Sequence, residues 1–307
     1  MTVQLEIHEA STEERKQIYA NVFDFWQWAD TVEEHVRLRL QSAQHQRARW
    51  YAGYADGKIV SSLGAYPLEF VLDGVEVPGI SIGSVHTLKA YRGQGLVPQL
   101  MQRVEQIEAE RGSKLSILYS DIDPKYYGRL GYQLCPSRQL SLAVTAGEQL
   151  KTSSFELAPL DADANRASLQ QVYDRCVRQH DVAILRDDNY WAYVIKKCQD
   201  DSFYELLKEG ESVGYVLAGA DGMCLKIRDY ATIDELSITN WFRALSKVAR
   251  ARDLGEIGGW LPDCSYSMQF YKERSSEITM IKHLTDGSLL KQRHFDACDA
   301  FREIDHV

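Results

Sequence analysis

Residues 92–98 read Arg92-Gly93-Gln94-Gly95-Leu96-Val97-Pro98, and they join a predicted strand over 80–88 to a predicted helix over 96–112. Glycines let the backbone turn tightly and approach an anion without a side chain in the way. The N–H groups and the positive dipole end of the following helix attract negative charge. The segment therefore predicts a phosphate-binding loop. A glycine turn that binds no ligand is an equally favoured interpretation of these residues taken alone.

Two common phosphate-binding motifs do not fit this loop. A P-loop requires Gly-Lys followed by Ser or Thr, which is absent here. A dinucleotide-binding motif needs a third glycine where Pro98 stands, and hairpins rather than a strand–helix unit precede the loop. Pro98 is compatible with the first turn of a helix, where its missing N–H has no intrahelical partner. Lys89 and Arg92 add positive charge.

The residues around the loop predict a mixed set of helices and strands. A capping box at 11–14 begins the first helix, and Asp-Gly pairs at 56–57 and 73–74 are typical of hairpins. The predicted helices cover 11–30, 33–45, 96–112 and 124–130, and the predicted strands cover 50–54, 59–66, 68–72, 75–77, 80–88, 115–119 and 132–144.

The same order of elements begins again after residue 150. The predicted helices cover 163–179, 188–198, 236–248 and 268–272, and the predicted strands cover 202–207, 212–217, 223–230, 256–261 and 277–284. We infer a structural repeat without sequence identity, with one domain over 1–150, a second over 151–285 and a tail over 286–307. Phe295, Cys298 and Phe301 predict a half-apolar tail helix that packs on the body.

Composition narrows the class of protein. The 307 residues are 45% hydrophobic and 26% charged, as in globular proteins, and a net charge of −9 disfavours nucleic-acid binding through charge. Six dispersed cysteines contain no CxxC pair, which disfavours a zinc site or a disulfide framework. The N-terminus lacks a signal sequence, and the longest uncharged stretch is twelve residues. We expect a cytoplasmic protein without a membrane span.

Two motifs together carry a family resemblance. Val85-His86-Thr87 followed by residues 92–97 resembles the acetyl-CoA signature of the GNAT acetyltransferase superfamily, R/Q-x-x-G-x-G/A, although Val97 stands where the signature prefers Gly or Ala. Residues 127–132, Tyr-Gly-Arg-Leu-Gly-Tyr, resemble the tyrosine-containing segment that closes the GNAT core. The tandem arrangement is similar to the enhanced-intracellular-survival type, without its sterol-carrier-like third domain. The implied fold class is α+β, with two GNAT folds, each a mixed, mostly antiparallel sheet flanked by helices.

The resemblance also implies a function. A GNAT N-acetyltransferase transfers acetyl from acetyl-CoA to a primary amine by direct attack, without a metal, and Tyr127 would be the general acid, with Tyr126 as its competitor. The alternatives are a non-catalytic GNAT-fold sensor or scaffold that binds acetyl-CoA and, more distantly, a nicotinamide-dependent oxidoreductase. By the resemblance, the cofactor-binding residues would be Val85, His86, Thr87, Arg92, Gly93, Gln94, Gly95, Leu96, Val97, Pro98 and Ser120.

The acceptor side stays open at this level. The amine belongs to a small molecule or a lysine side chain, and homo-oligomers are possible. Four aromatic residues either line the acceptor site or belong to the core: Trp26, Trp28, Trp50 and Tyr66. The acidic cluster of Asp30, Glu33 and Glu34 either is a solvated face or attracts a cationic acceptor. The base is water or one of several candidates, namely Asp30, Glu33, His35, Glu69 and His86.

The second half lacks the glycine loop. Its strand-to-helix junction, residues 228–235, has three carboxylates and no glycine, so we expect this half to bind no CoA and to shape the acceptor cleft or a subunit contact. Tyr271 echoes the tyrosine segment without a catalytic role. In three-domain relatives the terminal carboxylate reaches the active site, and whether Val307 does so here is open.

Overall fold

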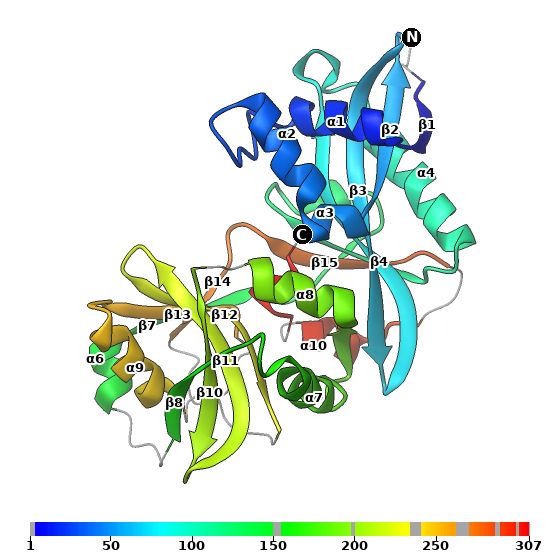
Figure 1. Ribbon diagram of the computed structural model, residues 1–307. Coiled ribbons are helices and arrows are strands. Elements are labelled where there is room, and N and C mark those ends of the chain that lie inside the picture. The colour runs from blue at the N-terminus through cyan, green and yellow to red at the C-terminus, as the bar shows by residue number, and fades with distance from the viewer. Residues whose placement is uncertain are drawn as a thin grey trace.

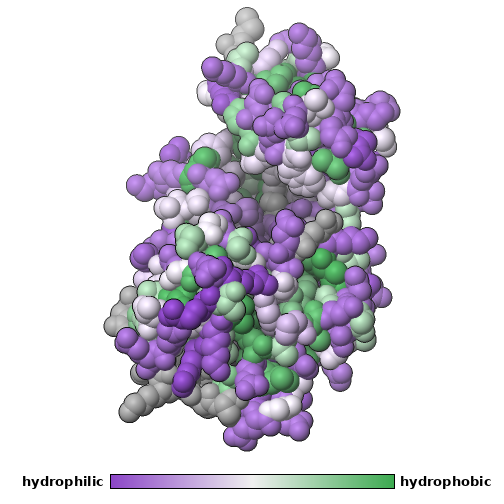
Figure 2. All heavy atoms as spheres, turned by 60° about the vertical axis from the view of Figure 1, so that its left-hand side comes forward, coloured by the Kyte–Doolittle hydropathy of each residue, from purple (hydrophilic) through white to green (hydrophobic). Residues whose placement is uncertain are grey.

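The computed structural model describes residues 4–149, 155–197, 200–233, 241–261, 270–285, 289–298 and 301–306. Two sheets, each flanked by helices, lie one above the other in Figure 1. The surface is hollowed between the two parts, with many hydrophilic residues around the hollow (Figure 2). Among the described helices, none combines the length and the apolar character that crossing a membrane requires.

The first sheet has the order β1-β2-β3-β4-β5-β15-β6, and β9 pairs with the far end of β3. Every pairing is antiparallel except β4 with β5. The strands are β1 (Glu6–Glu9), β2 (Arg49–Ala55), β3 (Lys58–Leu72), β4 (Val75–Thr87), β5 (Leu115–Ser120), β6 (Gln133–Leu134), β9 (Val182–Leu185) and β15 (Ile278–His283). The associated helices are α1 (Thr12–Asn21), α2 (Val32–Gln41), α3 (Ala43–Arg47), η1 (Lys89–Tyr91), α4 (Leu96–Glu110) and α5 (Lys125–Gly128).

The second sheet has the order β14-β7-β13-β12-β11-β10-β8. Its only parallel pair among the described strands is β12 with β13. The strands are β7 (Arg138–Ala143), β8 (Phe155–Leu160), β10 (Ser202–Lys208), β11 (Glu211–Asp221), β12 (Cys224–Thr232), β13 (Glu256–Gly259) and β14 (Tyr271–Glu273). The remaining helices are α6 (Val144–Gln149), α7 (Arg166–Val177), α8 (Asp188–Lys197), α9 (Phe242–Ala251), α10 (Gln292–Ala297) and η5 (Glu303–Asp305).

The two sheets exchange strands. β7 lies between β14 and β13 in the second sheet, although it precedes residue 150, and β15 lies between β5 and β6 in the first sheet (Figure 1). The expectation of one strand over 132–144 is therefore wrong: β6 and β7 belong to different sheets, and Pro136 lies between them. The expected helix over 268–272 is also wrong for its described part, because Tyr271–Glu273 pair with β7.

β3 is longer than expected because it runs through Pro67. A proline breaks a strand when its missing N–H removes a ladder hydrogen bond. Here Pro67 lies between the part of β3 that pairs with β2 and the part that pairs with β9, and its carbonyl oxygen accepts from Arg47 instead, at 3.5 Å. The proline thus faces a gap between two neighbouring strands. Likewise, the first helix ends at Asn21 rather than near Asp30.

The core joins the two parts of the molecule. One cluster of buried side chains contains Phe70 of β3, Trp191 of α8, Tyr215 of β11 and Ile281 of β15. The tail belongs to the same cluster, because Phe301 and Ile304 are buried in it and Phe295 packs against it. The expectation that the tail packs on the body is confirmed. This cluster spans both halves, whereas separate clusters lie around the first sheet and around the second.

Candidate active site

The glycine loop has the backbone that an anion site requires. Gly93 and Gly95 have φ of 76° and 74°, in the left-handed region that glycine adopts without strain, and no heavy atom lies within 4 Å of a Cβ built at either position. Gly95 is the N-cap of α4 and provides no side-chain acceptor for the N–H groups of the first turn. Those N–H groups therefore have no acceptor from the cap residue, and an anion at the start of the helix can accept from them.

The other residues of the loop support this geometry. Arg92 donates from Nε to the carbonyl of Thr87 at 3.0 Å and lies over the ring of Phe25. The Gln94 amide donates to the Ala90 carbonyl at 3.3 Å. The remaining three predicted residues lie in the first turn of α4: Leu96 is buried in the core, and Val97 and Pro98 are half-buried.

A β-bulge opens a gap beside the loop. The register between β3 and β4 shifts so that Ser84 and Val85 oppose Leu63, and Ser84 has a φ of 50°. The parallel pairing of β4 with β5 ends at Ile82 and Leu118. Beyond that pair the two strands separate, so the edge of β4 facing β5 is no longer paired by β5.

The side chains at the end of β4 do not all face this gap. Val85 lines the cavity described below. His86 is buried against Phe25, and its pKa is lowered by burial and by the nearby Arg92 charge. The Thr87 and Ser61 hydroxyls lie 2.9 Å apart. Ser120, at the end of β5, is buried and donates to the Ile122 carbonyl at 2.8 Å, so its hydroxyl closes a local turn.

A cavity of about 320 Å³ lies where β4 and β5 separate, a volume within the range of small-molecule sites. Tyr127 of α5 lines it, whereas its neighbour Tyr126 does not. Burial raises the pKa of Tyr127 to about 12, with smaller contributions from Tyr126 and Asp121. The Tyr127 phenol is therefore protonated near neutral pH and can donate a proton. Trp26, Trp28 and Tyr66 also line the cavity.

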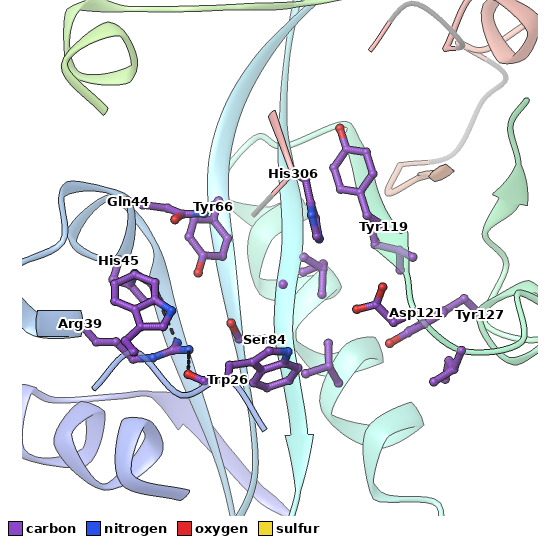
Figure 3. Close-up of a pocket in the computed structure, with 16 residues that line it drawn as sticks. Trp26, Arg39, Gln44, His45, Tyr66, Ser84, Tyr119, Asp121, Tyr127 and His306 are labelled. Carbon is purple, nitrogen blue, oxygen red and sulfur yellow. Dashed lines mark hydrogen bonds between the residues drawn. The ribbon is translucent and has the colours of Figure 1, made fainter. Parts of the chain in front are cut away.

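His306, from the tail, lies in the wall of the same cavity (Figure 3). Its Nδ1 lies 3.1 Å from Oε1 of Glu277, and its ring contacts Tyr119 and stacks on Trp260. The hydrogen bond with His306 lowers the pKa of Glu277. The Glu277 N–H donates to Asp121 at 3.2 Å. The Glu277 carboxylate thus fixes the orientation of the imidazole through Nδ1.

Sequence reasoning missed His306. It comes from the far end of the chain, and no spacing or motif links it to Tyr127. Asp305 beside it is buried because it pairs with Arg186, a partner 119 residues away that no local pattern in the sequence indicates. Val307 lies outside the described residues.

A buried ionic network places the tail. Oδ1 of Asp305 accepts from Arg186 at 2.9 and 3.2 Å and from the Tyr190 hydroxyl at 2.9 Å. Arg186 also donates to both oxygens of Asp229, at 2.6 and 3.1 Å. Lys197 donates to the Ile304 carbonyl at 2.9 Å. These bonds join the tail to β12 and α8, so the second half of the chain holds His306 at the cavity of the first.

The residues considered as bases from sequence lie elsewhere. His35 is fully buried, accepts at Nδ1 from the Trp28 N–H at 3.1 Å and donates from Nε2 to the Tyr19 carbonyl at 3.1 Å. Both of its ring nitrogens are thus occupied. Outside the cavity wall lie Asp30, Glu33, Glu69 and His86. Trp50 is buried in the core, and its indole donates to the His45 carbonyl.

The end of the cavity away from Tyr127 is cationic. Arg39 of α2 is only 2% exposed and yet lines the cavity. It donates to Nε2 of His45 at 2.9 Å and to the Trp26 carbonyl at 3.1 Å. Burial and the Arg39 charge lower the pKa of His45 to about 3, so the histidine is neutral. The acidic cluster outside is exposed, and its Glu34 pairs with Arg37.

The corresponding junction of the second half contains Asp229, which is fully buried and bonded to Arg186 and to the Tyr215 hydroxyl. Asp234 and Glu235, the other two carboxylates of that junction, lie outside the described residues. In the described part of the chain, no three His, Cys, Asp or Glu side chains gather as metal ligands would.

Known proteins resemble this chain in fold. The GNAT acetyltransferase domain family matches residues 6–135. A probable N-acyltransferase from Enterococcus faecalis superposes with a TM-score of 0.73 at 16% identity, over 92% of this chain and 73% of that one. A GCN5-related N-acetyltransferase from Anabaena variabilis gives 0.71 at 16% identity, over 92% and 73%. Eis1 from Mycobacterium abscessus gives 0.63 at 15% identity, over 92% and 74%.

A tandem GNAT protein of the clavulanic acid biosynthesis pathway covers the whole architecture: its TM-score is 0.53 at 9% identity, over 93% of this chain and all of that one. No curated protein sequence matches the chain. The predicted fold class is confirmed, with two mixed, mostly antiparallel sheets flanked by helices. Residues 6–135 match the GNAT acetyltransferase domain family, and the chain has the fold of tandem GNAT proteins.

Proposed function

We propose that this protein is an N-acetyltransferase that transfers acetyl from acetyl-CoA to a primary amine. The proposal is carried by the position of the cavity that Tyr127 lines, which lies where β4 and β5 separate. The glycine loop, whose helix has no side-chain cap, follows the end of β4 in the chain. A phosphate-bearing molecule on the loop can therefore extend an arm along the free edge of β4 into the cavity.

The residues present fit acetyl-CoA. The first-turn N–H groups of α4 and those of Gly93 and Gly95 would hold the pyrophosphate, and Val85, His86 and Thr87 would hydrogen-bond the pantetheine arm through their backbone. When bound, acetyl-CoA supplies a thioester whose carbonyl carbon forms the new bond to the amine nitrogen as the bond to sulfur breaks.

Two side chains of the cavity would handle the protons. Tyr127, which its raised pKa of about 12 keeps protonated at neutral pH, would donate its phenolic proton to the departing thiolate. His306 accepts a proton at Nε2 from the attacking amine, and Glu277 holds the ring in the tautomer that leaves Nε2 unprotonated. An amine with a pKa near that of lysine is mostly protonated at neutral pH, so it needs such an acceptor before it can attack.

Calorimetric titration with acetyl-CoA tests the cofactor assignment. Gly95→Glu places a carboxylate in the proposed phosphate site, where the surrounding space is open but the φ of 74° strains any side chain. Gly210→Glu is the matched control, because Gly210 also has a positive φ, of 86°, and open space, but lies on a hairpin of the second sheet. We expect binding in the wild type and the control and its loss in Gly95→Glu. Absence of binding in the wild type would refute the proposal.

Thiol release across a panel of amines tests catalysis. Release of free CoA that depends on an added amine supports the transferase. Intact acetyl-CoA binding without release for any amine would favour the non-catalytic sensor or scaffold.

A further inference from the structure

Arg39 is a buried cation without a carboxylate partner. No Asp or Glu in the described parts of the chain forms an ion pair with it, although its guanidinium is almost wholly enclosed. Its partners are neutral: the His45 imidazole, the Trp26 carbonyl, and the faces of Trp28 and Tyr19, at 4.9 and 5.9 Å from the guanidinium carbon. Burial of an unpaired charge costs several kcal/mol, so such a residue is rarely kept for packing alone.

The hydrogen-bonding capacity of Arg39 is also only partly used. The guanidinium has five N–H donors, and one bond goes to His45 and one to Trp26. The Nε–H is buried and has no acceptor among the described residues. Figure 3 shows Arg39, His45 and Trp26 together at one end of the cavity. A ligand carboxylate there would supply both the missing negative charge and acceptors in the planar geometry that guanidinium groups prefer.

The opposite end of the cavity has the opposite charge. Asp121 and Tyr127 lie there, and His306 lies in the adjoining wall (Figure 3). His306 pairs with Glu277, which does not itself line the cavity. A molecule with a carboxylate at one end and an amine at the other is thus complementary to both ends at once. Aromatic side chains, among them Trp26, Tyr66 and Tyr119, also line the cavity and suit an apolar spacer.

We propose that the acceptor is an amino acid or a related amine that carries a carboxylate, and that Arg39 binds this carboxylate while the amine faces Tyr127 and His306. The inference rests on the proposed function for the role of the amine, but the carboxylate site is testable by binding alone. It excludes polycationic amines as the preferred acceptors, because a second ammonium group would lie against the Arg39 charge.

Calorimetry with matched carboxylates and amides tests the site on the full chain. The probes are glycine, γ-aminobutyrate, ε-aminocaproate and para-aminomethylbenzoate, each compared with its primary amide, which keeps the shape and the amine and removes only the negative charge. We expect at least one carboxylate to bind about 10-fold or more tightly than its amide, as for a charge-assisted hydrogen bond. Equal binding of every pair, or no binding of any carboxylate, would overturn the proposal.

Variants distinguish carboxylate binding at Arg39 from nonspecific electrostatic attraction to the protein. Arg39→Gln should abolish the preference for the carboxylate, and Arg39→Lys should keep part of it. Arg37→Gln is the matched control on the same helix, because Arg37 is 52% exposed and pairs with Glu34 on the surface. A preference that survives in folded Arg39→Gln would overturn the assignment, and if that variant does not fold, the wild-type pairs and Arg39→Lys still decide.

Titration of acetyl-CoA in the same samples keeps the two proposals apart. Carboxylate preference without acetyl-CoA binding would refute the acetyltransferase and leave the Arg39 site standing. Acetyl-CoA binding together with equal affinity for carboxylates and amides would refute the Arg39 site and leave the acetyltransferase proposal standing.

Discussion

Asp305→Asn tests how the tail is held at the cavity. The wild-type network contains two buried cations, Arg186 and Arg302, and two buried anions, Asp229 and Asp305, so its charges balance. The substitution keeps the shape of the side chain but leaves one positive charge uncompensated. Removal of one partner of a buried ion pair costs about 3–5 kcal/mol.

Undocking of the tail offers the chain a way to avoid this penalty. Release of residues 301–306 would expose Phe301 and Ile304, which are 3% and 1% exposed. Each buried apolar side chain of this size contributes about 1.5–3 kcal/mol, so release costs about 3–6 kcal/mol in total. Because this range overlaps the electrostatic penalty, we expect the variant to populate both a destabilised docked tail and a released one.

Three measurements check this expectation. The free energy of unfolding in urea should fall by about 3–5 kcal/mol. Cleavage by trypsin after Arg302, which is 1% exposed in the folded protein, should accelerate. Acetyl transfer should fall because His306 leaves the cavity. Asp296→Asn is the control, since Asp296 is an exposed tail residue bonded to Gln292. A loss below about 1 kcal/mol, or a loss without faster cleavage, would refute the reasoning.

Four further predictions concern single side chains. Tyr127→Phe should lower kcat about 100-fold while acetyl-CoA binding by calorimetry stays intact, and Tyr126→Phe should not; equal losses would reject the assignment of the acid. His306→Gln should lower turnover most near neutral pH and least near about pH 11, where most of the amine is already neutral, and a pH-independent loss in the rate profile would argue against a base. Tyr271→Phe should leave turnover largely intact, and a collapse of activity in the folded variant would count against a non-catalytic second half. Glu14 has its pKa lowered to about 2 by hydrogen bonds from Ser11, His8 and Tyr54, so its stabilising effect is present above the ordinary value of 4.5 and is lost as the pH falls towards 2; urea unfolding of Glu14→Gln should vary less over that window, and an unchanged slope would contradict this.

Local signals predicted most of the first half. The capping box at Ser11 and Glu14 forms as expected, with both of its hydrogen bonds, and the Asp-Gly pairs close the predicted hairpins. These features depend on residues close together in the chain, where turn chemistry and capping act directly. The glycine loop belongs to the same class, because the positive φ at Gly93 and Gly95 follows from the residue type.

The predictions from sequence failed where the pairing of a strand depends on residues far away in the chain. Residues 132–144 look like one strand, but β6 pairs with β15 and β7 with β13 and β14, and no local pattern announces that exchange. The same holds for Pro67, which is compatible with a long β3 only because the strand has a gap between two neighbours at that point. Periodicity reports which face of an element is apolar and does not report which element covers it.

The glycine loop, most of the helices and hairpins of the first half, and the family resemblance follow from the sequence, because each depends on short spacings and backbone preferences. Which charged side chains meet depends on contacts that form in the folded chain. His306 lies at the cavity because Asp305 is bonded to Arg186 from the second half, and Arg39 lies there because α2 packs its polar face inward. Burial and long-range ion pairs set these positions, and both depend on contacts between residues far apart in the chain.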